Sequence, residues 1–220
     1  MLVTPLFRDR IQAGQVLARR VKAVVKDPDA LVLALPRGGV PVGFQIAQVL
    51  RLDLDIFVVR KLGVPGQPEL AMGAIASGGV RVLSESTIQD LGISPILVER
   101  VTAHERHEIE RRERTYREGR PALPIARRTV ILVDDGLATG ASMLAAARAV
   151  RIQKPKWVIV AVPVASRDAC EDFRQHVDVV VCAETPQPFY AVGTWYQDFS
   201  QTSDAEVREF LQRAAREHIS

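Results

Sequence analysis

One stretch of this chain, residues 130–142, constrains the fold more than any other. It reads VILVDDGLATGAS. The apolar run 130–133 is typical of a buried strand, and two acids, Asp134 and Asp135, stand directly at its carboxyl end. A short turn rich in glycine and alanine follows, and an apolar pattern with helical spacing then begins. The stretch therefore predicts a strand, a turn and a helix of an α/β fold, with both acids at the edge of the sheet.

The same turn has the chemistry of a sugar-phosphate site. The adjacent carboxylates of Asp134 and Asp135 can accept hydrogen bonds from two neighbouring ribose hydroxyls. Free N–H groups and the positive end of the following helix can bind a phosphate, and small side chains let the backbone approach the anion closely. The predicted phosphate-binding residues are Gly136, Leu137, Ala138, Thr139, Gly140, Ala141 and Ser142.

The composition is that of a globular protein, and we expect one domain over residues 1–220. The chain is 47% hydrophobic and 25% charged, and 220 residues can bury one sizeable core. The longest apolar run, 158–165, is too short to span a bilayer, and charges near the start interrupt any signal-peptide core. We therefore expect a cytoplasmic protein. Cys170 and Cys182 lack metal-ligand spacing and are predicted to be buried, reduced thiols.

Strand-like and helix-like patterns alternate along the chain, which predicts a parallel sheet with helices on both faces. Strands are expected at 31–35, 55–59, 129–133, 157–164 and 177–182, and a hairpin at 72–76 and 80–83. Helices are expected at 8–25, 40–50, 95–117, 140–152 and 167–176. Ser203 and Glu206 have the spacing of a capping box, which predicts the start of a last helix.

A second turn has the same pattern as the first, with a strand, small residues and then a helix. Residues 35–40 read LPRGGV, so an apolar strand runs into two glycines and then into a helix. Gly38 and Gly39 permit close approach of the backbone to an anion, and Arg37 adds a forked donor that is always charged. The net charge of +3 suits an anionic substrate. The chain thus carries a second predicted anion site.

The acid pair with the Leu-Ala-Thr-Gly of residues 137–140 resembles the signature of the type I phosphoribosyltransferases. The Arg-Gly-Gly turn is similar to that of bacterial xanthine–guanine phosphoribosyltransferases. The resemblance covers about residues 30–200. It implies a parallel-sheet α/β fold with a small hood and a flexible loop. It also implies a pentosyltransferase that moves the ribose 5-phosphate of phosphoribosyl diphosphate (PRPP) to a nitrogen acceptor, a nucleobase or a related compound, with release of diphosphate.

The resemblance also implies roles for the two turns. Asp134 and Asp135 would hold the 2′- and 3′-hydroxyls of the ribose, directly or through hydrated Mg²⁺, which is the implied cofactor. Arg37, with the backbone of Gly38 and Gly39, would stabilise the leaving diphosphate. PRPP and a small nitrogen acceptor are the expected partners. A homo-oligomer, as a dimer, is expected as well.

Residues 61–80 are rich in glycine and proline, which is typical of a loop, and the resemblance implies a flexible loop that closes over PRPP. Arg60 and Lys61 stand where the end of a strand could aim positive charge at the diphosphate. Hypoxanthine–guanine enzymes carry an Asp in the signature turn that helps to move the base proton, whereas this chain has Ala138 there. Glu69 could take that part, as a loop glutamate does in the adenine type. A solvated loop acid is the alternative.

Residues 184–200 hold a concentration of aromatic side chains and are the candidate hood over the acceptor. Flat apolar rings can stack on a heterocycle, and Phe189, Trp195 and Tyr196 are the candidate base-binding residues. The alternative is that these aromatics pin the last helix to the core. The sequence favours neither a purine nor a pyrimidine.

The charged segment 95–117 carries two histidines, His104 and His107, that share a helix face. No third ligand stands out, and charges of both signs alternate as they do on a solvated helix. Neither a metal site nor a nucleic-acid surface is expected there.

Three other functions stay open. A PRPP-binding regulator that has lost catalysis would keep the fold, with or without RNA as its partner. A PRPP synthetase would need a second related domain, and a structural interaction module would have no use for two phosphate turns in register. The patterns G-x-x-x-x-G-K-[ST] and G-x-G-x-x-G are absent, which argues against a P-loop nucleotidase and a dinucleotide-binding dehydrogenase.

Overall fold

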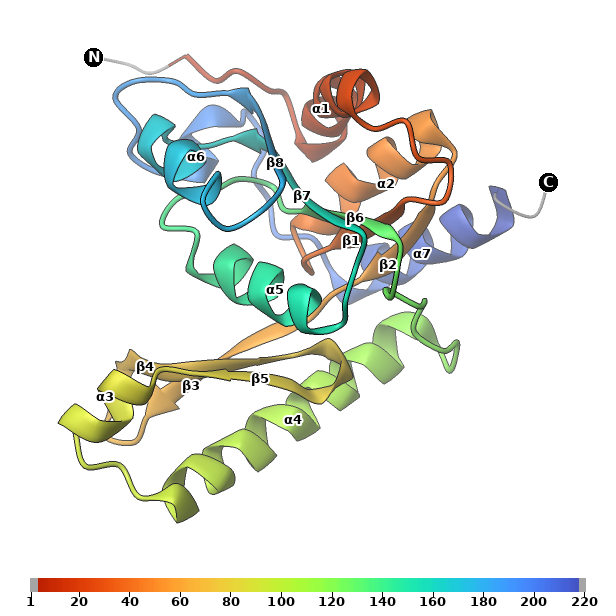
Figure 1. Cartoon of the computed structure of the whole chain (residues 1–220). Coiled ribbons are helices and arrows are strands. Elements are labelled where there is room, and N and C mark those ends of the chain that lie inside the picture. The colour runs from red at the N-terminus through yellow and green to blue at the C-terminus, as the bar shows by residue number, and fades with distance from the viewer. Residues whose placement is uncertain (1–3, 218–220) are drawn as a thin grey trace.

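Five parallel strands form the central sheet of the computed structural model, which describes residues 4–217 apart from the side chains of Pro68 and Glu69. The strands lie in the order β2–β1–β6–β7–β8 (Figure 1). Their bounds are Leu31–Ala34 for β1, Asp53–Ile56 for β2, Thr129–Val133 for β6, Trp157–Val164 for β7 and Val179–Glu184 for β8. The expected parallel α/β sheet is confirmed.

Helices cover both faces of this sheet (Figure 1). One face packs against α1 (Arg10–Val24), α2 (Gly39–Leu50) and α7 (Asp204–Glu217), and the other against α5 (Ala141–Ile152) and α6 (Arg167–Phe173). Successive residues of a strand point to opposite faces, so each strand supplies both cores. In β6, for example, Ile131 and Val133 join the first core, whereas Val130 and Leu132 join the second.

A smaller antiparallel sheet lies beside α5. It consists of β3 (Val59–Val64), β4 (Gln67–Ala76) and β5 (Val80–Leu83), in the order β3–β4–β5. Figure 1 shows these strands between α5 and the long helix α4 (Pro95–Arg117), with the short α3 (Glu85–Asp90) at one end. A single 3₁₀ turn, η1 (Ser77–Gly79), connects β4 to β5, so the expected hairpin is confirmed.

The expectation of a loop over 61–80 is wrong in its secondary structure. β3 and β4 pair as a hairpin that turns only at residues 65–66, where Gly66 has a φ of 83°. Leu62 and Met72, which are fully buried, anchor these strands in the same core as α4. Glycine and proline concealed this apolar pattern in the sequence, because both residues are typical of loops.

A buried ion pair joins the end of α4 to the edge strand β2. The Arg117 Nε donates to Asp55 Oδ1 at 2.8 Å, and the same guanidinium donates to the Ile56 carbonyl at 3.0 Å. Glu113 accepts a further contact from Arg117 at 3.0 Å, and the Leu123 N–H donates to Asp55 Oδ2 at 3.0 Å. Asp55 and Arg117 are both buried. These bonds fix α4, and with it the antiparallel sheet, to the central sheet.

The last helix begins as its sequence predicts. The Ser203 N–H donates to Glu206 Oε2 at 2.7 Å, and the Glu206 N–H donates to Ser203 Oγ at 3.2 Å, so the capping box is confirmed. Among residues 4–217, the structure contains no helix long and apolar enough to cross a membrane.

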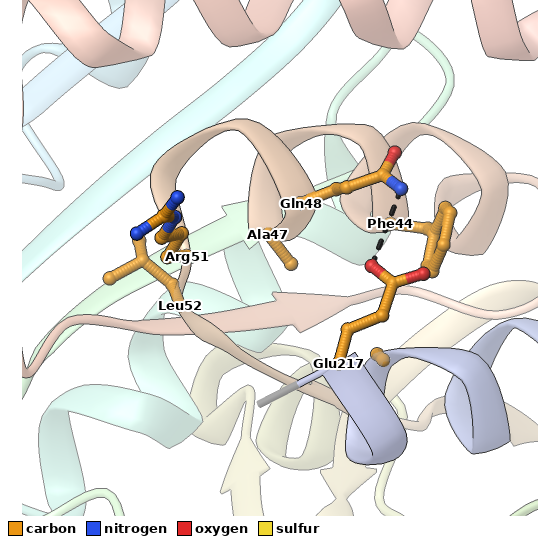
Figure 2. Close-up of a pocket in the computed structure, with 7 residues that line it drawn as sticks. Phe44, Ala47, Gln48, Arg51, Leu52 and Glu217 are labelled. Atoms are coloured by element: carbon orange, nitrogen blue, oxygen red, sulfur yellow. Dashed lines mark hydrogen bonds between the residues drawn. The ribbon is translucent and has the colours of Figure 1, made fainter. Parts of the chain in front are cut away.

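A cavity of about 470 Å³ lies between α2 and α7 (Figure 2). Phe44, Ala47 and Leu52 give it an apolar wall, and the Gln48 amide donates to Glu217 Oε2 at 3.3 Å at its rim. The cavity sits beside the carboxyl-terminal end of α2, just before β2 begins. It therefore lies at the amino edge of the parallel sheet, opposite the edge that holds Asp134 and Asp135.

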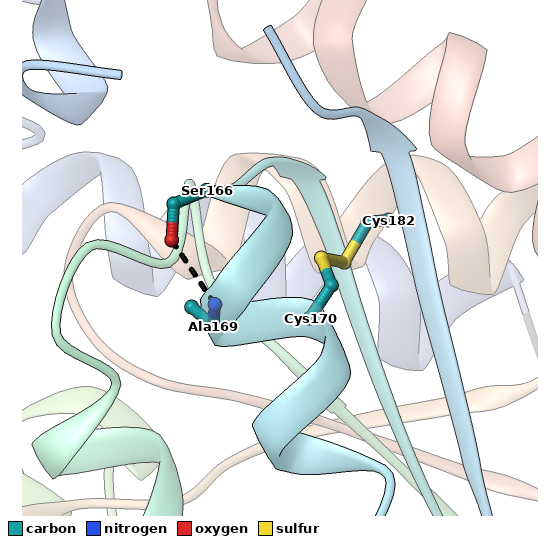
Figure 3. Close-up of a disulfide and its surroundings, with 4 residues drawn as sticks. All are labelled: Ser166, Ala169, Cys170 and Cys182. Atoms are coloured by element: carbon teal, nitrogen blue, oxygen red, sulfur yellow. Dashed lines mark hydrogen bonds between the residues drawn. A yellow bond between two sulfur atoms is a disulfide. The ribbon is translucent and has the colours of Figure 1, made fainter. Parts of the chain in front are cut away.

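The two cysteines form a disulfide, so the prediction of reduced thiols is wrong. Cys170 on α6 and Cys182 on β8 are bonded, with their Cα atoms 6.7 Å apart (Figure 3). The Ser166 Oγ accepts from the Ala169 N–H at 3.1 Å and caps the helix that carries Cys170. The sequence gives only the separation of 12 residues. The pairing depends on α6 lying alongside β8, which the cysteine spacing does not show.

Opening this disulfide is expected to lower the free energy of unfolding by about 3 kcal/mol, because the bond closes a loop of the unfolded chain. The measurement is urea-induced unfolding with and without a thiol reductant. The control is the Cys170→Ala, Cys182→Ala variant, whose stability should not respond to the reductant. Equal stability of the oxidised and reduced wild-type protein would contradict the prediction.

Candidate functional site

The two predicted anion turns lie side by side, because β1 and β6 are neighbours in the parallel sheet. Gly38 and Gly39 pack directly against the acid pair. A Cβ on Gly38 would stand 2.0 Å from Asp135 Oδ2, and one on Gly39 would stand 2.6 Å from the Val133 carbonyl oxygen. No side chain fits at either position, so both glycines are required by space. The Pro36–Arg37 peptide in the first turn is cis.

The acid pair is largely shielded from solvent, and one of its carboxylates accepts a hydrogen bond from the neighbouring backbone N–H. The Asp135 N–H donates to Asp134 Oδ1 at 2.8 Å. Burial raises the pKa of Asp134 well above its ordinary value, and the neighbouring carboxylate of Asp135 raises it further. Burial also raises the pKa of Asp135, while the guanidinium of Arg10 opposes that shift. The site therefore favours ligands that bring positive charge or hydrogen-bond donors to these oxygens.

The signature turn leads directly into the first turn of α5. Gly140, just before the helix, has a φ of 71°, a conformation that suits glycine, and its position provides no side-chain cap for the helix start. The Leu137 N–H donates to the Val164 carbonyl at 2.9 Å, which fixes the start of the turn. Ala138 and Thr139 are exposed, as are Ala141 and Ser142. The helix start therefore faces solvent at the carboxyl edge.

Arg37 lies in the first turn, but its side chain is engaged at the start of α7. Its Nη1 is 3.4 Å from Asp204 Oδ1, and the Tyr116 hydroxyl donates to the same oxygen at 2.8 Å. Burial and this bond raise the pKa of Tyr116 to about 12. The Arg37 side chain is 31% exposed. A diphosphate at the Gly38–Gly39 turn would have to compete with Asp204 for it.

The other two predicted cations occupy different positions. The Arg60 Nε donates to Glu105 Oε2 of α4 at 2.6 Å. Lys61 lines a cavity of about 330 Å³ between the antiparallel sheet and α5, together with Ser142 and Arg148. The structure thus associates Lys61 with the start of α5 more closely than with the glycine turn. The side chain of Glu69 lies outside the described residues.

The aromatic segment folds over the signature turn, but two of its rings are buried. Trp195 is 6% exposed and Tyr196 is 4% exposed, and both pack in a small core with Phe7. Their burial disagrees with the expected stacking on a base. They pack against Phe7 and against Ala13 of α1, not against the last helix, so the alternative that they pin that helix to the core is not confirmed either. Phe189 is half-buried and stacks on Trp195, with ring centroids 6.4 Å apart.

The start of the chain holds this aromatic segment in place. The N–H groups of Leu6 and Phe7 both donate to the Trp195 carbonyl at 3.0 Å, and the Asp198 N–H donates to the Arg8 carbonyl at 2.8 Å. Val192 contacts the signature turn so closely that a Cβ on Gly136 would lie 2.4 Å from its Cγ1. Residues 6–8 and 192–198 therefore form one cover over the acid pair.

Two contacts with Asp135 have no counterpart in the sequence motifs: Arg10 was not a candidate residue, and Tyr196 was a candidate only for contact with the base. The Arg10 Nε donates to Asp135 Oδ2 at 2.8 Å, and the Tyr196 hydroxyl donates to the Asp135 carbonyl at 2.6 Å. Both lie far from Asp135 along the chain, so no motif links them to it. The helix start at Asp9, which accepts from the Gln12 N–H at 2.8 Å, was the one local signal near Arg10.

Comparison with known proteins identifies the family of this chain. The family model described as the phosphoribosyl transferase domain matches residues 11–198. A Mycobacterium tuberculosis H37Rv protein that carries a provisional phosphoribosyl transferase name is 45% identical over 212 residues. That alignment covers 96% of this chain and 48% of the relative, and a protein of strain CDC 1551 matches equally. This chain thus spans about half the length of the curated relatives it matches.

Solved structures share the fold. The crystal structure of TT1426 from Thermus thermophilus superposes with a TM-score of 0.84 at 42% identity, covering 94% of this chain and 98% of that one. A hypothetical protein from Neisseria gonorrhoeae, crystallised with bound ppGpp, has a TM-score of 0.53 at 11% identity, covering 97% and 98% of the two chains. The second likeness concerns the fold alone.

Proposed function

The chain belongs to the phosphoribosyl transferase family, and we propose that it transfers the ribose 5-phosphate of PRPP to a nitrogen acceptor with release of diphosphate. The observation that carries the proposal is the junction of two glycine turns at the acid pair. Gly38 and Gly39 touch the residues that bear the carboxylates, and the open start of α5 follows within the same turn. PRPP has anionic groups at both ends of its ribose, and this edge offers a place for each.

The start of α5 would bind the 5′-phosphate. The N–H groups of residues 138–142, the helix dipole and the hydroxyls of Thr139 and Ser142 are the donors there, whereas the Leu137 N–H is already bonded to the Val164 carbonyl. Asp134 and Asp135 would then accept hydrogen bonds from the ribose hydroxyls. Lys61, which shares a cavity with Ser142, adds positive charge beside this end of the substrate.

The Gly38–Gly39 turn would bind the diphosphate, with Arg37 as its cation. In the reaction, the bond from C1′ to the diphosphate oxygen breaks, the diphosphate keeps the electron pair, and a bond from C1′ to the acceptor nitrogen forms. Positive charge grows on the ribose ring, and the carboxylates beneath it stabilise that charge. Glu69 is the proposed acceptor of the nitrogen's proton. Phe189 is the remaining candidate for contact with the acceptor.

Mg²⁺ fits this donor set when the substrate completes it. Mg²⁺ is usually held by one or two carboxylates together with substrate phosphates and water, rather than by a cage made of protein alone. Asp134 and Asp135 supply two adjacent carboxylates at this edge, and no group of three or more His, Cys, Asp or Glu side chains that could hold a metal ion gathers among the described residues. Bound there, Mg²⁺ would neutralise charge on the leaving diphosphate.

The test is calorimetric titration of the protein with PRPP and Mg²⁺, followed by assays of diphosphate release with purines, pyrimidines and simple amines. Binding together with release in the presence of one acceptor is the expected result, and it names the substrate. Binding without release across the whole panel would favour a regulator that senses PRPP. Absence of binding would overturn the assignment of the signature turn.

Arg37→Ala is expected to weaken diphosphate binding by about tenfold to a hundredfold, the effect of losing one charge-assisted hydrogen bond. Ribose 5-phosphate, which does not reach the Gly38–Gly39 turn, should bind with nearly unchanged affinity. Calorimetry with the two ligands separately measures both effects. Asp204→Asn is the matched variant, because it frees Arg37 without removing it and should not weaken diphosphate binding. Equal losses for both ligands in Arg37→Ala would contradict the role of Arg37.

A further inference from the structure

Arg10 places a fixed positive charge on one of the two signature acids. Its Nε lies 2.8 Å from Asp135 Oδ2, and its Nη1 donates to the Ser200 carbonyl at 2.6 Å. The guanidinium lies 4.0 Å above the centre of the Phe199 ring. The Arg10 side chain is only 11% exposed. Three different partners therefore hold this guanidinium in one place.

The backbone beneath Arg10 is equally well held. Arg10 is the first residue of α1, and the Asp9 side chain caps that helix by accepting from the Gln12 N–H at 2.8 Å. The preceding residues pair with the Trp195 segment, as described above. The charge beside Asp135 is thus part of the folded site and not a mobile surface contact.

The space around the Asp135 carboxylate is restricted as well. A Cβ on Gly38 would lie 2.0 Å from Asp135 Oδ2 and 3.2 Å from the Arg10 Nε. This oxygen is therefore enclosed between the Gly38 backbone and the guanidinium. A hydrated Mg²⁺ requires near-octahedral oxygen ligands and gives up its water reluctantly, so it does not fit in this gap.

The two acids also differ in whether a neighbouring cation balances their charge. Arg10 cancels the formal charge of Asp135, so the pair presents one net negative charge instead of two. A nearby divalent cation is attracted roughly in proportion to that charge. Within residues 4–217 no ion pair reaches Asp134, whose Oδ1 accepts the Asp135 N–H. The two neighbouring carboxylates are thus unequal.

We propose that Arg10 is a positioning residue that reserves Asp135 for the ribose hydroxyls and confines a divalent cation to Asp134 and the substrate's own oxygens. The ribose part rests on the proposed function. The part that concerns the cation does not, because it follows from the geometry of the protein alone.

The test measures Mn²⁺ binding by the protein without sugar phosphate, using the electron paramagnetic resonance signal of free Mn²⁺. Arg10→Gln, which restores the second negative charge, is expected to bind Mn²⁺ at least about tenfold more tightly than the wild type. The double variant Arg10→Gln, Asp135→Asn has the net charge of the wild-type site and should return to wild-type affinity. Arg8→Gln is the control, because Arg8 is largely exposed and pairs with Asp9.

An unchanged Mn²⁺ affinity in folded Arg10→Gln would overturn the proposal. So would equal affinities of Arg10→Gln and the double variant, because Arg10 would then act on the fold and not through charge. If Arg10→Gln does not fold, Asp134→Asn and Asp135→Asn still decide the matter, because they remove the same charge. Asp134→Asn should lose Mn²⁺ affinity more strongly, and equal or reversed losses would overturn the proposal.

A second readout separates this proposal from the proposed function. With EDTA present, Arg10→Gln should bind ribose 5-phosphate about tenfold more weakly than the wild type, because Asp135 is no longer oriented. Unchanged binding in EDTA by the variant would overturn the ribose part. If the wild-type protein binds no PRPP while Arg10→Gln still gains Mn²⁺ affinity, the proposed function fails and the control of the cation by Arg10 stands.

Discussion

Replacing Asp134 and Asp135 together with asparagine is expected to lower PRPP affinity by at least about a hundredfold, the effect of losing two charged hydrogen-bond acceptors. Asparagine has the shape of aspartate, and its side-chain oxygen at position 134 can still accept the backbone N–H of the next residue. The turn itself should therefore persist. Calorimetry with PRPP and Mg²⁺ measures the loss, and unchanged affinity would refute the site.

Asp134→Asn alone is the control for the fold, because it leaves the ion pair between Arg10 and Asp135 intact. Burial and the Asp135 carboxylate raise the pKa of Asp134 above its ordinary value of 3.8. Its contribution to stability is therefore fully present below pH 3.8 and is lost as the pH rises through the raised pKa. The variant does not titrate there. It should unfold at a higher temperature than the wild type at pH 7, and the difference should shrink as the pH falls.

Arg117→Ala is expected to lower the free energy of unfolding by about 3–5 kcal/mol, because it leaves the Asp55 carboxylate buried without its cation. Both partners are shielded from solvent, since Asp55 is 5% exposed and Arg117 is 8% exposed. Urea-induced unfolding followed by circular dichroism measures the change. The loss should be large because Arg117 also donates to the Ile56 carbonyl and contacts Glu113.

Arg111→Ala is the matched control for Arg117→Ala on the same helix. Arg111 pairs with Glu108 at 2.8 Å, but its side chain is 59% exposed, and exposed pairs of this kind contribute little to stability. A second variant, Arg117→Met with Asp55→Asn, removes both buried charges and should recover part of the lost stability. Equal effects of Arg117→Ala and Arg111→Ala would contradict the structural role of the buried pair.

Much of the fold follows from local patterns in the sequence. The helix expected at 95–117 and the strands expected at 129–133 and 157–164 have the bounds that the structure shows. In α4 the agreement has a clear cause, since Ser94 caps the helix and Pro95 occupies its first turn. Strand β2 runs over Asp53–Ile56 instead of 55–59, because the polar Asp53 at its start is typical of a loop in the sequence.

Only part of the candidate site follows from local patterns in the sequence. Parallel neighbours bring their carboxyl ends together, so the meeting of the two turns could be predicted from the order of motifs along the chain. The contacts of Arg10 and Tyr196 with Asp135 could not be predicted, because these residues lie 125 and 61 positions from Asp135 along the chain. Such contacts depend on the packing of the whole domain. The aromatic segment was ambiguous for a related reason, since a ring that binds a ligand and a ring that fills a core have the same composition.

The pairing of residues 6–8 with residues 195–198 has a consequence for how the protein folds while the ribosome synthesises it. Contacts between segments so far apart close late, because the intervening chain must first be made and brought together. The central strands can begin to pair while synthesis continues, but the cover over Asp135 cannot close before residue 198 has emerged. A nascent chain therefore completes its central sheet first and the cover over Asp135 last. If the ribosome stalls before residue 198 emerges, the acid pair stays uncovered.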